Sequence, residues 1–148
     1  RPDDRYFALT HKQIAIDIFV HDVLNDHFVC GVSDTPGDIQ WRFSAFSLRR
    51  VIIAGREWTV PNTTERYLSE TYGHAWRTPD KGFASAVSSP ALFGVNPYAR
   101  SYYALTRAQR ALRRGDWTKA TTLLRQSPVA LDSSLAERFL GGGDMHAS

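Results

Sequence analysis

The chain has 148 residues, of which 43% are hydrophobic, and its formal net charge is +3 at pH 7. This length and apolar content suit one domain with a hydrophobic core, with or without a small appendage, and they exclude wholesale disorder. The mild positive charge is compatible with anionic substrates but does not by itself indicate nucleic-acid binding, which we do not expect. The single Cys30 excludes an intramolecular disulfide framework and is typical of a reducing compartment. The sequence lacks an apolar run of about 18 residues, so we expect no transmembrane segment.

A strand is the first element that we expect, over residues 12–22, after a polar lead-in at residues 1–5. Apolar side chains alternate onto one of its faces, at Ile14, Ile16, Ile18 and Val20. The other face is also apolar apart from Asp17, which predicts a central strand buried on both sides. A carboxylate in that position is costly unless it is paired or bound to a metal. Asp17 is therefore a candidate site residue. His21 lies on the same face, about 13 Å further along, where it could reach a substrate phosphate.

More strands and one helix are expected before residue 73. Residues 27–32 and 40–43 are short strands on either side of a turn cluster at 33–38. Residues 47–54 and 58–60 flank a glycine-containing loop and predict a β-hairpin. A helix over about residues 63–72 follows, with Asn62 as N-cap and Glu65 at the reciprocal capping position. Gly73 is the natural stop for this helix.

The C-terminal third has a different pattern. Residues 79–98 lack any periodicity and predict a long ordered loop. From Ser101 onward, two helices are expected across a Gly115–Asp116 turn, followed by a short helix over 134–140. Four arginines make the first of these helices basic: Arg107, Arg110, Arg113 and Arg114. Their spacing predicts a solvated face rather than a tight patch, with an anionic polymer, a membrane surface or an acidic partner as alternatives. We therefore expect three parts, namely 1–98, a helical-hairpin appendage at 99–140 and a disordered tail at 141–148.

One stretch carries a family resemblance. Val60 to Pro79 reads VP-N-x-x-E-x-Y-L-x-x-x-Y-G-x-x-W-R-x-P. This pattern resembles the segment near the C-terminal end of the LicD/fukutin family, where it follows a nucleotidyltransferase-like core. The resemblance covers residues 14–92. The fold class that we predict is α+β: a mixed or antiparallel sheet over about residues 14–60 packs against the 63–72 helix, as part of such a core, and a C-terminal helical hairpin follows.

The resemblance also implies an activity. Enzymes of this family move a phosphocholine or phospho-alditol group from a CDP-linked donor onto a cell-surface glycan, with Mg²⁺ or Mn²⁺ as cofactor. By resemblance, Asp17 would be a catalytic metal ligand, because its strand matches the position of the family's third carboxylate. Arg77 would contact a phosphate or the glycan, and His21, Trp76 and Tyr72 would help to bind substrate. The implied location is cytoplasmic, with the inner membrane surface as the alternative.

Alternatives remain for the whole chain and for its residues. The glycine-rich segment and the acidic run of the family do not occur here. Either the first catalytic half lies outside this chain, or the chain is a noncatalytic module that docks a protein partner through residues 101–126. An RNA-associated protein is a third reading. Asp17 could instead cap backbone N–H groups or pair with Arg49, and Tyr72, Trp76 and Pro79 could simply pack the loop onto the sheet.

Overall fold

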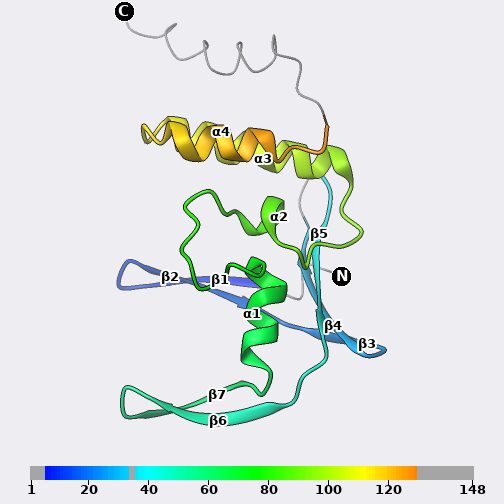
Figure 1. The fold of residues 1–148 in the computed structure, drawn as a ribbon, viewed down its shortest axis with the longest axis vertical. Coiled ribbons are helices and arrows are strands. Elements are labelled where there is room, and N and C mark those ends of the chain that lie inside the picture. The colour runs from blue at the N-terminus through cyan, green and yellow to red at the C-terminus, as the bar shows by residue number, and fades with distance from the viewer. Residues whose placement is uncertain (1–5, 34–35, 130–148) are drawn as a thin grey trace, which may run out of the picture.

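Antiparallel strands followed by helices make up the computed structural model, which describes residues 6–33 and 36–129 (Figure 1). The strands form three small sheets: β1 (Tyr6–His11) with β2 (Ile14–Phe19); β3 (Asp22–Leu24), β4 (His27–Val32) and β5 (Ile39–Ser44); and β6 (Leu48–Ile53) with β7 (Arg56–Pro61). The helices are α1 (Thr64–Tyr72), α2 (Ser85–Ser88), α3 (Pro97–Leu112) and α4 (Trp117–Arg125). The α+β class, the antiparallel pairing and the helical hairpin of α3 and α4 are therefore confirmed.

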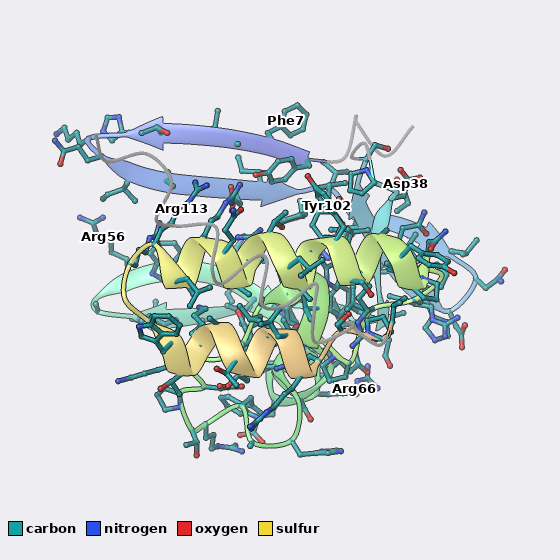
Figure 2. All side chains as sticks on the ribbon, turned by 90° about the horizontal axis from the view of Figure 1, so that it is seen from above. Phe7, Asp38, Arg56, Arg66, Tyr102 and Arg113 are labelled. Carbon is teal, nitrogen blue, oxygen red and sulfur yellow. The ribbon has the colours of Figure 1, made fainter. Side chains whose placement is uncertain are left out.

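The strand that carries Asp17 is not a buried central strand, and that prediction was wrong. It is β2, which pairs only with β1 in a two-stranded hairpin whose turn residues Lys12 and Gln13 have positive φ. Every residue of β2 is exposed, and Ile14 keeps 63% of its surface. Figure 2 shows Phe7 projecting from this hairpin away from the helices. The apolar pattern predicted burial, but the sequence of a strand does not report how many other strands or layers cover it. The prediction failed for this reason.

The main core lies between the β3–β4–β5 sheet and the helices α2 and α3. Its buried residues come from β4, β5, α2, α3 and the segment after α2: Cys30, Ile39, Trp41, Phe43, Ala86, Val87, Ala91, Ala99, Tyr103 and Ala104. The segment after α2 runs along β5, where Arg42 N donates to Ala91 O at 2.9 Å and Phe93 N donates to Gln40 O at 3.1 Å. Residues 79–98, which were predicted to be a long ordered loop, contain α2 and supply buried side chains to this core.

Helix α1 begins differently from the prediction. Thr63 is its N-cap and makes no side-chain capping bond. Asn62 Oδ1 instead accepts from Ser47 N at 3.2 Å, which ties the chain before the helix to the start of β6. The expected N-cap at Asn62 was thus wrong. The expected stop is confirmed, since Gly73 follows α1 with φ of 89°.

Helices α3 and α4 lie side by side (Figure 2) around a second small core of Ala108, Ala111, Ala120 and Leu123. Helix α3 begins at Pro97 rather than at Ser101, because Asn96 Oδ1 accepts from Tyr98 N at 2.8 Å and proline is favoured at the first helical position. The predicted boundary between residues 98 and 99 falls inside α3. The predicted helix over 134–140 and the tail at 141–148 lie outside the described residues.

Candidate functional site

Asp17 is held by a hydroxyl group from the neighbouring strand. Tyr6 Oη donates to Asp17 Oδ1 at 3.0 Å across the β1–β2 hairpin. This hydrogen bond is the main cause that raises the pKa of Tyr6 above 10.0, followed by burial and by the charge of Asp17, while the charge of Arg107 lowers it. Asp17 therefore does not depend on a metal or on Arg49 for a partner, and it is exposed rather than buried.

The metal site that the resemblance implies needs several carboxylates or other ligands close together. Within residues 6–33 and 36–129, no group of three or more His, Cys, Asp or Glu residues is placed to hold a metal ion. Asp17 alone is a single carboxylate that already accepts a hydrogen bond. The described residues therefore do not fit a Mg²⁺ or Mn²⁺ site, and we derive no catalytic step through such an ion.

His21 lies beyond the end of β2 and packs against the sheet. Its ring centroid is 5.6 Å from that of Phe43. Burial lowers the pKa of His21 below 6.5, and a backbone hydrogen bond with Phe19 opposes this shift. Its Nε2 atom is buried and has no hydrogen-bond partner among the described residues. This environment favours a neutral packed imidazole over a group that binds a phosphate.

Aromatic residues of the Tyr72–Pro79 segment surround a cavity of about 340 Å³. We call it the aromatic cavity, and its lining residues are Tyr72, Ala75, Trp76, Thr78, Pro79, Asp80 and Phe83. The rings of Tyr72 and Phe83 meet with their centroids 5.0 Å apart. Asp80 Oδ1 accepts from Gly82 N at 2.7 Å, which fixes the carboxylate at the edge of the loop. The cavity thus combines aromatic surface with one acidic group.

Arg77 lies in the same loop and contacts Trp76 and Glu65. Its guanidinium lies 4.2 Å from the centroid of the Trp76 ring and pairs with Glu65 Oε1 at 2.5 Å. Glu65 stands in the first turn of α1, so this pair connects the start of the helix to the loop that follows its end. Arg77 does not line the aromatic cavity. Its visible partners support a structural role more directly than a contact with substrate.

The structure brings together only some of the residues that the sequence singled out. Tyr72 and Trp76 share the aromatic cavity. In the described parts of the chain, no hydrogen bond, ion pair or ring contact links Asp17 or His21 to them. Sequence reasoning missed Asp80 and Phe83 as site residues, although they lie one and four residues after Pro79 and could have been found by extending the motif that far.

Comparison with models of protein families, with curated proteins and with solved structures found no match. No family is therefore assigned to the chain, and its function has to be inferred from the residues of the site. None of the described helices has the length and apolar character to cross a membrane.

Proposed function

We propose that this chain is the C-terminal, ligand-binding part of a LicD/fukutin-type transferase that moves phosphocholine from a CDP-linked donor onto a cell-surface glycan. In this proposal the aromatic cavity receives the choline group. One observation carries the proposal: Tyr72, Trp76 and Pro79, three residues of the motif that carries the family resemblance, all line the same cavity. The sheets and α1 would then belong to a nucleotidyltransferase-like core.

The chemistry of the cavity supports choline over an alditol. A quaternary ammonium carries a positive charge but has no N–H to donate, so it is best held by aromatic faces and a nearby carboxylate. Tyr72, Trp76 and Phe83 offer the rings, and Asp80 offers the charge. An alditol has many hydroxyl groups that would each need a hydrogen-bond partner in such a site. A volume of about 340 Å³ is also of the size that small ligands occupy.

This proposal gives the described residues a binding role and assigns none of them a catalytic step. The carboxylate of Asp17 is occupied by Tyr6, and the described residues do not fit a metal site. The CDP-linked donor and the glycan acceptor remain the implied partners of the complete enzyme.

Calorimetry with choline, phosphocholine and ribitol phosphate tests the proposal. We expect saturable binding of both choline compounds and weaker or no binding of ribitol phosphate. Trp76→Leu and Asp80→Asn should each weaken choline binding by about threefold to thirtyfold, the range that a lost cation–π or charge contact gives. Asparagine keeps the oxygen that accepts from Gly82, so D80N removes charge without removing the loop contact.

The control for these variants is Trp117→Leu, because Trp117 is exposed on α4 and does not line the cavity. It should bind choline as the wild type does. If choline fails to bind the wild type, or if all three variants lose binding equally, the choline assignment is wrong.

A second candidate is the noncatalytic module that docks a protein partner through residues 101–126. The observation that favours it is the Tyr6–Asp17 hydrogen bond, which leaves Asp17 with a structural role. Titration with a CDP-linked choline compound separates the two. Saturable binding that Trp76→Leu weakens would favour the transferase part, and absence of choline and nucleotide binding would favour the module.

A further inference from the structure

Basic side chains surround a cavity on another part of the molecule. This cavity, of about 420 Å³, lies where α3 and the start of α4 approach residues 83–85, and its cations are Arg107, Arg110, Arg114 and Lys119. A neighbouring cavity of about 440 Å³ shares Arg114 and Lys119 and adds Lys81. We call the two together the basic cavity. It lies outside the residue range of the family resemblance, apart from residues 81–85.

The arginines reach the basic cavity from the C-terminal half of α3 and the turn after it. Arg107 and Arg110 stand at positions i and i+3, which share one face of α3, and Arg114 lies in the turn that follows the helix. Arg113 does not line either cavity, and in Figure 2 it extends from α3 on the side away from α4. All four arginines are exposed, as the expectation of a solvated face requires, but three of them line the same cavity and so lie closer together than predicted.

The charges of this group are not compensated by ion pairs with described acids. None of the five cations takes part in an ion pair that the described residues form. Like charges at helical neighbour positions repel, and Lys119 stands in the first turn of α4, where the helix dipole disfavours a cation. A bound anion would relieve both effects.

One carboxylate, that of Asp116, lines both parts of the basic cavity. Its Oδ1 accepts from Lys119 N at 3.0 Å and so caps α4. The helix N-terminus therefore offsets part of its charge. Five cations against one capping carboxylate leave a strongly positive concave surface.

We propose that the basic cavity binds a ligand that carries two or more closely spaced phosphate groups, which we call an oligophosphate. Guanidinium groups hold phosphate oxygens in bidentate fashion, and several arginines around one hollow match closely spaced phosphates better than a single one. A nucleic acid would require cations spread along a backbone path, whereas these converge on a hollow. This site does not depend on the choline assignment, because it uses different residues apart from Phe83, which lines both cavities.

Calorimetric titration of the full chain with pyrophosphate at low salt tests the proposal. We expect one saturable site. Arg114→Gln should weaken binding by at least about tenfold, because Arg114 lines both parts of the cavity and loses a charge-assisted contact. Arg113→Gln is the matched control, with the same change of charge one residue away, and should alter the affinity by less than about twofold, as expected for a charge at the surface.

Two further variants separate effects on phosphate binding from effects on the stability of the fold. Asp116→Ser keeps a capping oxygen and removes the charge, so it should tighten pyrophosphate binding while leaving the melting temperature unchanged. Arg107→Gln tests the far side of the cavity and should weaken binding without changing the circular dichroism spectrum. Absence of pyrophosphate binding, or equal losses in R113Q and R114Q, would overturn the proposal.

Binding experiments with vesicles and with an RNA oligonucleotide identify the source of the phosphate groups. Recruitment of vesicles that contain phosphatidylinositol bisphosphate, competed by pyrophosphate and lost in R114Q, would identify a lipid headgroup as the source. Pyrophosphate binding without vesicle recruitment would identify a soluble oligophosphate. Binding of an RNA oligonucleotide that pyrophosphate does not displace, with no pyrophosphate site of its own, would contradict the proposal.

Discussion

At the scale of one residue, Asp17 was a candidate site residue because its neighbours in the sequence are apolar. In the structure it makes a local contact within the β1–β2 hairpin. Its carboxylate accepts a hydrogen bond from Tyr6 and raises the pKa of that phenol. Asp17→Asn removes the negative charge, so the pKa of Tyr6 should fall back toward 10.0. NMR titration of labelled tyrosines measures this. Tyr98, which lies on α3, is the internal control, and its NMR signals should be the same in the variant as in the wild type. An unchanged Tyr6 pKa would mean that the hydrogen bond does not form in solution.

His21 gives a prediction of pH dependence. Burial lowers its pKa below 6.5, so the unfolded state binds the proton more tightly than the folded state. The contribution of His21 to stability is therefore complete above 6.5 and is lost as the pH falls through 6.5 toward the folded-state pKa. Thermal melting between about pH 7 and pH 5 should show a falling melting temperature that His21→Phe makes less steep.

The control for His21 is His74→Gln, because His74 is exposed. This variant should keep the full pH dependence of the wild type. If H21F and the wild type lose stability equally across this range, the buried imidazole does not cause the effect.

At the scale of elements, the end of α1 is fixed by a single glycine. Gly73 has φ of 89° and ψ of 174°, a backbone conformation that is almost restricted to glycine. A side chain would meet only Pro90 Cγ at 3.9 Å, so the cost of a substitution comes from the backbone. Gly73→Val should lower the free energy of unfolding by about 1–3 kcal/mol.

Chemical denaturation measures this loss, and His74→Ala next to it is the control. That variant should change the free energy of unfolding by less than about 0.5 kcal/mol, as is usual for exposed positions. A Gly73→Val protein as stable as the wild type would show that the helix does not end with this conformation.

Local signals in the sequence were sufficient for some of these elements. The β6–β7 hairpin turn at Ala54–Gly55, the stop at Gly73 and the Gly115–Asp116 turn depend on residues next to one another, and they formed where expected. The start of α3 was also encoded locally, by Asn96 and Pro97, but we placed it at Ser101. The burial of β2 was not encoded locally, because it depends on which other elements cover the strand.

The two candidate sites also differ in whether residues close together in the sequence form them. Tyr72 and Trp76 lie four residues apart and reach one cavity through the local end of α1. The basic cavity depends on contacts between residues distant in sequence, since Phe83 and Lys119 line it together. The spacing of the arginines in the sequence does not predict that these elements contact each other.

At the scale of the whole molecule, the helical hairpin should be part of the folded unit. Ala99 and Tyr103 of α3 lie in the same core as Trp41, and Leu123 of α4 is fully buried beneath α3. Leu123→Ala should lower the free energy of unfolding by about 2–5 kcal/mol, because the cavity that it leaves cannot fully collapse. Far-ultraviolet and near-ultraviolet melting should remain a single coincident transition.

Leu124→Ala is the matched control on the same helix, since Leu124 is only partly buried. Leu124→Ala should lower the free energy of unfolding by clearly less than Leu123→Ala does. If L123A melts the helices while the sheet signals persist, the hairpin is a separate unit and not part of the main core.

In the function that we propose, the loop after α1 closes a cavity for a choline group. The most direct measurement is a titration of the isotope-labelled chain with choline, followed by the indole N–H signals of its tryptophans. We expect the Trp76 signal to shift along a saturable curve, while those of the exposed Trp58 and Trp117 stay in place. Equal shifts at all three, or no shift at Trp76, would contradict it.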